Sequence, residues 1–322
     1  MLVLTVTRQC NLRCSYCSAP KDDWPSLSAE DCTRAIELFA GRYGGGDVKI
    51  FGGEPLLVPE ATRAAAAAAQ AAPEIHRVYL STNGLALDAD WLALVRETPK
   101  LVLTVSLDGT ASDHDLHRRR RGGEGGSYER AVERLPELLA TPRVVVTQTI
   151  PPALAHRAAE NLEHLLSLGF RRFNLLPGYF LPWSEEQLTA LRDNFARIAR
   201  LIEARWERGE RFYLRNLFTW APSAFFNQGL IVDADRRIHA SNLGQWGSFE
   251  ELLEETLVGD LDHPPAATTL AVRGRRVLAL LEKVVPGPAL ESTRAVDAAL
   301  TAFCRRLYPA LAARRRRERD VA

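Results

Sequence analysis

The sequence lacks a long hydrophobic run, and it lacks an excess of charge of either sign. The best candidate for an apolar span is the alanine tract 64–69, which is far shorter than the ~20 apolar residues needed to cross a bilayer. The 41 Lys and Arg residues nearly balance the 40 Asp and Glu residues and leave a formal net charge of +1. These absences predict no membrane partner and no general affinity for nucleic acid.

A secretory signal is also missing. The chain begins with the apolar stretch Met-Leu-Val-Leu-Thr-Val-Thr, which has no basic region before it and no small-residue cleavage site after it. We interpret this stretch as a first β-strand and predict a cytoplasmic protein. Because the strand starts so early, we also expect no peptide-recognition domain ahead of it.

The five cysteines are poorly suited to a disulfide scaffold, because their number is odd and their placement is uneven. Cys10, Cys14 and Cys17 lie within eight residues, whereas Cys32 and Cys304 stand alone. This distribution agrees with a reducing cytoplasm. Cys32 falls on the apolar face of a predicted helix, where we expect it to be part of the core.

The three clustered thiols can hold one metal centre. Their intervals are too uneven for a helix face and too tight for a strand, so we expect a loop. Thiolates favour zinc or iron–sulfur clusters. A closed zinc site usually takes four ligands in two separated pairs, and no second pair follows in the sequence. Three ligands would leave one iron of a cubane cluster open.

Short apolar segments alternate with helical patterns over the first half of the chain. Strands are predicted at 2–7, 47–51, 77–80, 101–106, 143–150 and 172–176. Helices are predicted between them, the first from Ser28-Ala-Glu-Asp31 to about Gly41, the next after the second strand to about Ala72, and later ones at about 88–97, 128–139 and 157–168. Continuous Val, Leu and Ile runs are typical of parallel strands covered on both faces, which predicts an α/β fold with helices outside a parallel sheet. The pattern does not distinguish an open sheet from a barrel.

The alternation stops after a long helix that is predicted to run from a capping box at Ser184 and Gln187 to about Trp206. An aromatic segment follows at 209–226, then a β-hairpin at 230–241. Further helices are predicted near 249–255, 271–283 and 292–308. We predict two domains, at 1–206 and 207–322.

A glycine pair, Gly52-Gly53, and a carboxylate, Glu54, follow the second predicted strand. Glycine lets a backbone approach a ligand closely, and exposed carbonyls there can accept from an ammonium group. Such a pair is also common in plain turns. Its position at a strand end, like that of the cysteine loop, favours a binding role, because α/β folds build their sites at the carboxyl ends of strands.

The pattern Cys10-x-x-x-Cys14-x-x-Cys17, with the aromatic Tyr16 before the last cysteine, resembles the radical S-adenosylmethionine (SAM) enzymes. The resemblance implies that these cysteines bind one 4Fe-4S cluster, whose fourth iron is chelated by SAM. It also implies that Tyr16 stacks on adenine, although packing under the loop is an alternative. The fold that it implies is a partial six-stranded parallel (β/α)6 TIM-like barrel.

Other segments extend the resemblance. In the family, a Gly-Gly-Glu segment after the second strand binds the methionine amino group of SAM, and Gly52, Gly53 and Glu54 match it. The loop with Asn83 is similar to a family loop that faces the cofactor, and a plain Asn-Gly turn is the alternative.

The fourth strand ends in Ser106-Leu-Asp108-Gly, which resembles the sulfatase-maturing and other peptide-modifying enzymes of the family. By that resemblance Ser106 and Arg118 hold the SAM carboxylate or ribose, and Asp108 lies close to the substrate. An arginine suits a carboxylate because its planar fork donates two parallel hydrogen bonds. Arg118 opens a run of four arginines, so another member of 118–121 is an alternative.

Many peptide-modifying relatives carry a cysteine-rich C-terminal extension, called SPASM or twitch, that binds auxiliary clusters. The segment 226–260 resembles its layout but has no cysteine. We therefore expect a degenerate extension and a single cluster.

The expected function is reductive cleavage of SAM to a 5′-deoxyadenosyl radical that takes hydrogen from a substrate. A flavodoxin- or ferredoxin-type protein is the expected electron donor. A ribosomal peptide is the favoured substrate, and a small molecule such as a natural product, sugar or amino acid is the alternative. Outside this class, a structural or interaction protein that holds zinc remains an alternative.

Overall fold

The computed structural model describes residues 1–19, 24–122, 125–219, 228–245 and 251–320. The chain is divided into two compact units. Unit 1 consists of Met1–Ser106, Asp115–Val144 and Phe226–Pro286. Unit 2 consists of Leu107–His114, Val145–Phe225 and Gly287–Ala322. Helix α4 (Ala111–His117) crosses the division. Within the described ranges no helix is long and apolar enough to span a membrane.

Unit 1 is built on seven neighbouring strands in the order β12-β11-β10-β1-β3-β4-β5. From β10 to β5 each neighbour is parallel, and β11 and β12 add antiparallel pairs at the edge. The strands are β1 (Leu2–Thr7), β3 (Gly46–Gly52), β4 (Ile75–Thr82), β5 (Leu101–Ser106), β10 (Gln228–Val232), β11 (Arg237–Ser241) and β12 (Leu257–Asp260).

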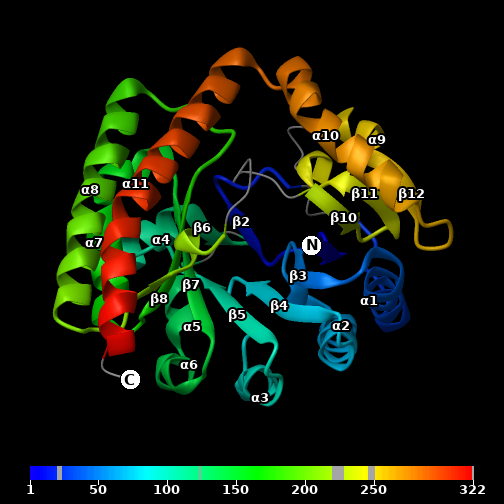
Figure 1. Ribbon diagram of the computed structural model, residues 1–322, viewed down its shortest axis with the longest axis horizontal. Helices are drawn as coiled ribbons and strands as arrows, with labels where there is room; N and C mark the ends of the chain where they lie inside the picture. Colours follow the sequence, from blue (N-terminus) through cyan, green and yellow to red (C-terminus); the bar gives the residue numbers. More distant parts are fainter. Residues whose placement is uncertain (20–23, 123–124, 220–227, 246–250, 321–322) are drawn as a thin grey trace. The chain divides into compact units, whose positions relative to one another are not determined.

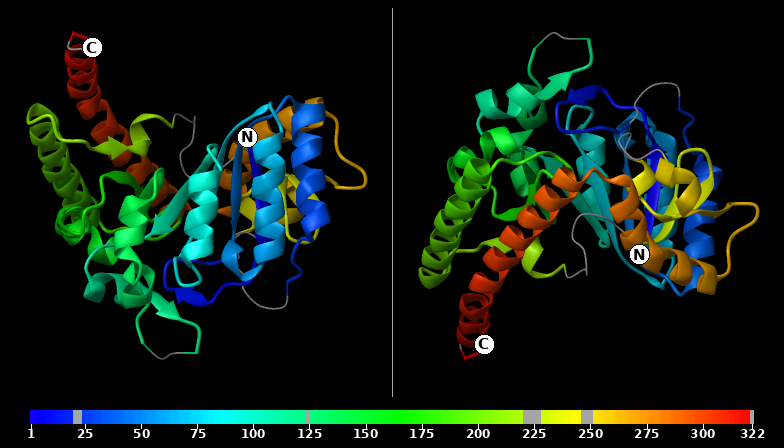
Figure 2. Two further views of the ribbon diagram at one scale, coloured as in Figure 1. Left: turned by 90° about the horizontal axis from the view of Figure 1, so that it is seen from below. Right: turned by 90° about the horizontal axis from the view of Figure 1, so that it is seen from above.

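Three helices lie in a row along one side of β1, β3, β4 and β5 (Figures 1 and 2). They are α1 (Ala29–Tyr43), α2 (Pro59–Ala71) and α3 (Ala89–Glu97). The predicted start of the first is confirmed in detail, because Ser28 and Asp31 form a reciprocal capping box. The helix ends at Gly44, whose left-handed conformation carries no side-chain penalty.

The remaining helices and 3-10 turns of unit 1 are short apart from α10. They are α5 (Tyr128–Val132), α6 (Leu135–Ala140), α9 (Glu251–Thr256), α10 (Ala267–Val284) and the 3-10 turns η1 (Pro55–Leu57) and η4 (Leu243–Gln245). The prediction of one helix over 128–139 is wrong. The chain breaks at Glu133 and Arg134 because Pro136, in the first turn of α6, cannot donate the hydrogen bond that a continuous helix needs.

Unit 2 contains β7 (Val144–Ile150), β8 (Arg172–Pro177) and β9 (Tyr213–Leu214), which are parallel in that order. Its helices are α7 (Ala158–Ser167), α8 (Glu185–Glu207) and α11 (Gly287–Asp320), with η2 (Pro152–Arg157) and η3 (Arg215–Leu217). Helices α8 and α11 pack along each other (Figure 1). Between them the rings of Phe195 and Phe303 stack, with 4.9 Å between centroids. The α8 capping box of Ser184 and Gln187 is confirmed.

The α/β class and the largely parallel sheet are therefore confirmed, and closure into a barrel stays a prediction. The C-terminal part contributes to both units, since the β10–β11 hairpin pairs with β1 in unit 1 while α11 packs on α8 in unit 2. The predicted domain boundary after residue 206 also stays a prediction. Of the aromatic segment 209–226, residues 220–226 lie outside the described residues.

A two-stranded ribbon that the sequence analysis did not predict carries part of the cysteine loop. Strand β2 (Leu12–Cys14) pairs antiparallel with β6 (Arg118–Arg120), so that Cys14 lies opposite Arg118. The ribbon is extended at both ends, because the Ser15 N–H donates to the His117 carbonyl and the Arg121 N–H donates to the Asn11 carbonyl, each at 3.0 Å.

A buried ion pair joins the C-terminal hairpin to the end of β1. Arg8 pairs through two nitrogens with the carboxylate of Asp233, and both side chains are almost fully buried. The Arg8 guanidinium also stacks over the ring of Trp24, 3.5 Å from its centroid. The cation is thus held between a carboxylate and an aromatic face in low-dielectric surroundings.

We expect Asp233→Ala to destabilise unit 1, because the substitution leaves the charge of Arg8 buried without a counterion. The expected loss is about 3–5 kcal/mol of unfolding free energy, measured by urea denaturation of the cluster-free protein. Asp262→Ala is the matched control, since Asp262 pairs with Arg34 and Arg236 in half-exposed positions. That control should cost under about 1 kcal/mol; equal losses would contradict the assignment.

Candidate cofactor site

The predicted cysteine loop lies between the end of β1 and the β2–β6 ribbon in unit 1. Cys10 is buried, and Cys14 and Cys17 are partly exposed. The Cys17 N–H donates to the Cys14 carbonyl at 3.1 Å, which closes a turn between the last two cysteines. The cysteines lie on a loop as expected, except that residues Leu12–Cys14 in its middle form the short strand β2.

The sulfur of Cys10 accepts two hydrogen bonds. The Leu12 N–H donates to Sγ at 3.4 Å, and the Asn83 side-chain amide donates at 3.8 Å. Such donors stabilise a thiolate, and hydrogen bonds to cluster sulfurs are one way a protein sets a cluster's reduction potential. Cys10 therefore receives donors from its own loop and from the loop after β4.

Gly52 and Gly53 bring the end of β3 against the backbone that leads into the cysteine loop. Gly53 N–H donates to the Thr7 carbonyl, and Glu54 N–H donates to the Gln9 carbonyl, both at 2.8 Å. A Cβ on Gly52 would collide with the Thr7 carbonyl oxygen, and one on Gly53 would collide with that of Gln9. The glycines are thus required by close packing of two loops, whatever further role they have toward a ligand.

Glu54 is completely buried and accepts three hydrogen bonds. Oε1 accepts from the Leu56 N–H and the Thr82 hydroxyl, and Oε2 accepts from the Asn83 N–H at 2.7 Å. Burial raises the pKa of Glu54 to about 7, although these donors and the nearby Arg118 oppose the shift. The carboxylate ties the end of β3 to the end of β4, and its predicted contact with the SAM amino group stays a prediction.

Asn83 links this network to the cysteine loop. Its backbone bonds Glu54, and its side-chain amide donates to Asn11 Oδ1 at 2.7 Å as well as to Cys10. The side-chain oxygen accepts from the Leu85 N–H at 3.0 Å, as in an Asx turn. Asn83 therefore serves the turn and the loop together.

The structure distinguishes Arg118 from the other arginines of its run. Arg118 is buried and lies over the ring of Tyr16, 5.5 Å from its centroid, whereas 119–121 are exposed. The Tyr16 ring also lies 6.0 Å from that of His117, whose Nδ1 is 2.6 Å from the Ser15 hydroxyl oxygen. The predicted contacts of Tyr16 and Arg118 with SAM stay predictions.

The two remaining predicted residues follow β5. Ser106 ends that strand in unit 1 and is partly exposed. Asp108 belongs to unit 2, is buried, and accepts the Thr149 N–H at 3.0 Å. Its own N–H donates to His114 Nδ1 at 3.3 Å. Asp108 is therefore tied to the end of β7, and its predicted place beside the substrate stays a prediction.

The three thiols have the ligand chemistry that a cubane cluster needs. Across the described ranges, no three His, Cys, Asp or Glu side chains come close enough together to hold one metal ion. In a cubane each thiolate binds a different iron, so the sulfurs need not converge on one point. Three thiols on one loop, with amide donors at the first, match the cluster.

Sequence reasoning missed Asn11, Thr82 and His117, which support the predicted residues. Their contacts bridge segments about 30 to 100 residues apart: Thr82 to Glu54, Asn11 to Asn83 and His117 to Ser15. No local pattern marks such partners.

A family model for the radical SAM superfamily matches residues 4–152, a range that contains every predicted cluster and cofactor residue. Residues 4–152 therefore form a radical SAM domain. Radical SAM enzymes use a 4Fe-4S cluster together with SAM, so Cys10, Cys14 and Cys17 are the residues that would hold the cluster here.

Two curated relatives differ in how much of this chain they match. The serine-type anaerobic sulfatase-maturating enzyme of Klebsiella aerogenes is 28% identical over 304 residues, covering 84% of this chain and 71% of the relative. GTP 3′,8-cyclase of Chlorobaculum tepidum is 36% identical over 150 residues, covering 44% and 42%. The chain thus spans under half the length of the cyclase.

A solved structure of native anSMEcpe, with bound AdoMet and Kp18Cys peptide, has a TM-score of 0.72 at 12% identity. The match covers 98% of this chain and 99% of that one. At this identity the likeness establishes a shared fold and no more.

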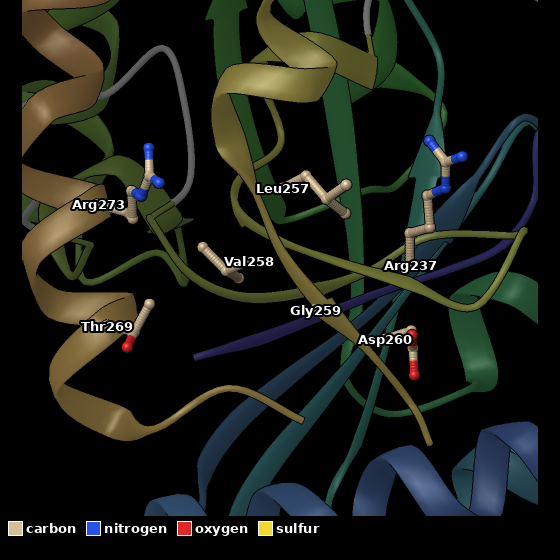
Figure 3. A pocket seen from close by; sticks show the side chains of 7 residues that line it. All are labelled: Arg237, Leu257, Val258, Gly259, Asp260, Thr269 and Arg273. Carbon is tan, nitrogen blue, oxygen red and sulfur yellow. The ribbon is translucent and has the colours of Figure 1, made fainter. Parts of the chain in front are cut away.

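Other candidate features lie apart from the cysteine loop. Burial raises the pKa of Cys32 and of Cys304 to about 12, which keeps both as inert thiols. A pocket of about 450 Å³ lies between β12 and α10, where Arg237 and Arg273 flank the strand (Figure 3). None of the predicted cofactor residues lines it.

We expect Gly53→Ala to abolish cluster loading, because its Cβ would displace the Gln9 carbonyl next to Cys10. The measurement is iron content after anaerobic reconstitution. Gly41→Ala is the matched control, since a Cβ there meets nothing within 4 Å inside α1. Near-normal iron in Gly53→Ala would show that the close approach is dispensable.

Glu54 should also give a pH signature. Because the folded protein holds this proton more tightly than the unfolded chain, unfolding free energy should fall as pH rises from 4.5 to about 7, then level off. The decline should be a few kcal/mol, since one pKa unit is about 1.4 kcal/mol. The measurement is the difference in unfolding free energy between wild type and Glu54→Gln, both cluster-free, as a function of pH. This difference should show the same decline; a difference that does not change with pH would refute the raised pKa of Glu54.

Proposed function

We propose that this radical SAM enzyme uses a single 4Fe-4S cluster to modify a ribosomally made peptide. The observation that carries the proposal is the convergence of the cysteine loop with Glu54, Asn83 and Arg118 in one unit. When bound, the cluster supplies the electron that cleaves SAM to methionine and a 5′-deoxyadenosyl radical, which takes a hydrogen atom from the substrate.

The protein's own residues have distinct parts in this proposal. Asn83 and the Leu12 N–H donate to the Cys10 sulfur, and such donors favour the thiolate form that binds a cluster. Arg118 offers a cation beside Tyr16, where a carboxylate of SAM would be favourably bound. Glu54 maintains the spacing of the loops, and its pKa near neutrality lets it meet an ammonium group as a carboxylate or hold a proton.

The peptide substrate is supported by the length of the match to the sulfatase-maturating enzyme and by the fold shared with a peptide-bound structure. The described part of the aromatic segment offers rings for contact. Tyr213 and Phe218 stack at 5.0 Å in unit 2, and Arg315 lies over Phe218. Phe218 is substantially exposed.

The second candidate is a small-molecule substrate. The observation that favours it is the 36% identity to GTP 3′,8-cyclase over 150 residues. To separate the two, formation of 5′-deoxyadenosine should be measured with short peptides encoded beside the gene and, separately, with GTP. Stimulation by a peptide that changes in mass supports peptide modification. Stimulation by GTP alone would overturn it.

We expect one cluster per chain, held by Cys10, Cys14 and Cys17. Anaerobically reconstituted protein should bind about four irons, and replacing all three cysteines with Ala should remove them. Cys32→Ala and Cys304→Ala are the controls and should keep the iron. Tight binding of more iron, or retention of a cluster by the triple variant, would refute the single-cluster assignment.

A further inference from the structure

The loop after β8 leaves a run of apolar and aromatic side chains at the surface of unit 2. Tyr179, Phe180 and Leu181 are half-buried, and Pro182 is exposed. We call residues 179–182 the β8 loop. A run of such residues that stays in contact with water is typical of a binding surface, because loops without that role are mostly polar.

Phe180, in the middle of the β8 loop, has a strained backbone. Its φ is +60°, in the left-handed region that glycine adopts freely and that a bulky residue rarely adopts. Glycine or asparagine at this position would relieve the strain, so the phenyl ring is present at a cost in stability. Strain of this kind persists only where surrounding contacts hold the residue in place, and it is concentrated at functional sites.

Helix α11 holds the β8 loop in this conformation. The Phe180 N–H donates to the Thr293 hydroxyl at 2.8 Å, and the Trp183 N–H donates to the Ser292 hydroxyl at 3.1 Å. The Trp183 indole donates to the Gly178 carbonyl at 2.8 Å, which ties the end of the loop to its start. Thr293, Ser292 and Trp183 are all buried. The position of Phe180 is therefore set by buried hydrogen bonds.

The β8 loop begins at the carboxyl end of its strand, where α/β folds build their sites. The Gly178 N–H donates to the Ile150 carbonyl at 2.8 Å, so the loop starts against the end of β7. Asp108, which is predicted to lie beside the substrate, accepts the N–H of Thr149 at the same strand end. Thr149 pairs with Leu176, just before the loop. Asp108 and the β8 loop are thus attached to neighbouring positions of one strand pair within unit 2.

We propose that Phe180 determines substrate specificity by packing its ring, together with Leu181, against an apolar side chain of the substrate peptide. This inference rests on the proposed function. Residues 178–183 include no charged side chain, so the loop fits an apolar group better than the phosphates of a nucleotide. A ring that is already held in place gives contact area with little loss of conformational entropy on binding.

The test measures 5′-deoxyadenosine formation by the reconstituted enzyme against the concentration of the peptide, encoded beside the gene, that stimulates the wild type. Phe180→Ala removes the ring, so the peptide concentration for half-maximal stimulation should rise about tenfold. The maximal rate and the peptide-free rate of SAM cleavage should change little, because the ring takes no part in the chemistry. Phe180→Tyr keeps the ring and should respond to the peptide nearly as the wild type does.

Three comparisons separate peptide contact from folding. Phe180→Gly also lacks the ring but accepts the left-handed conformation, so its urea midpoint should exceed that of Phe180→Ala while its peptide defect is equal. Thr293→Val removes the acceptor of the Phe180 N–H and should weaken the peptide response, whereas Thr293→Ser keeps the hydroxyl and should preserve it. Tyr308→Ala removes an exposed ring farther along α11 and, as the matched control, should leave the response unchanged.

The outcomes are distinct. The same half-maximal peptide concentration in wild type, Phe180→Ala and Phe180→Gly, at normal iron content, would overturn the proposal. Reduced stability of these variants with an unchanged peptide response would also overturn it, by assigning the β8 loop a purely structural role. A wild type that holds no cluster, or that cleaves SAM but is stimulated by no peptide, would instead contradict the proposed function itself.

Discussion

The cofactor site depends on a close approach between two backbones. The chain leaving β1 offers the carbonyls of Thr7 and Gln9, and the chain leaving β3 donates to them from Gly53 and Glu54. Only glycine fits at positions 52 and 53, because any Cβ would collide with these carbonyls. This contact fixes the position of Cys10, which follows Gln9, and the position of the Glu54 carboxylate, which follows Gly53. The cysteine loop and the Gly-Gly-Glu segment are therefore positioned by the same backbone contact.

Buried polar groups extend this contact outward. The Glu54 carboxylate accepts hydrogen bonds from Thr82 and Asn83 at the end of β4. The Asn83 side chain in turn donates to Asn11 in the cysteine loop. On the other side, Arg8 anchors the same loop to Asp233 in the C-terminal hairpin. Buried charges are costly unless they are paired and hydrogen-bonded, so each of these groups fixes its neighbours' positions. The cysteine loop is therefore held from three strands of unit 1.

Sequence patterns predicted the local parts of this structure well. The bounds of β1 and β5 agree residue for residue, and the capping boxes at Ser28 and Ser184 have the expected bonds. Continuous apolar runs predict the strands, and residues three positions apart predict the capping boxes. The three cysteines and the Gly-Gly-Glu segment were equally readable, since their chemistry is concentrated in a few adjacent residues.

Contacts between distant segments were not readable. Strands β2 and β6 have three residues each and no apolar alternation, so nothing local marks their pairing across about 100 positions. The choice of Arg118 among four arginines follows from that pairing, which turns Arg118 inward opposite Cys14. The parallel docking of β10 on β1 likewise depends on tertiary packing that no short pattern encodes.

The central claim is that this loop assembles a cluster that engages SAM. The most direct measurement is electron paramagnetic resonance of the anaerobically reconstituted, reduced protein, recorded with and without SAM. The account predicts the signal of one reduced 4Fe-4S cluster whose shape changes when SAM is added, because SAM binds the open iron. Zinc at one per chain, or a cluster signal that SAM leaves unaltered, would contradict it.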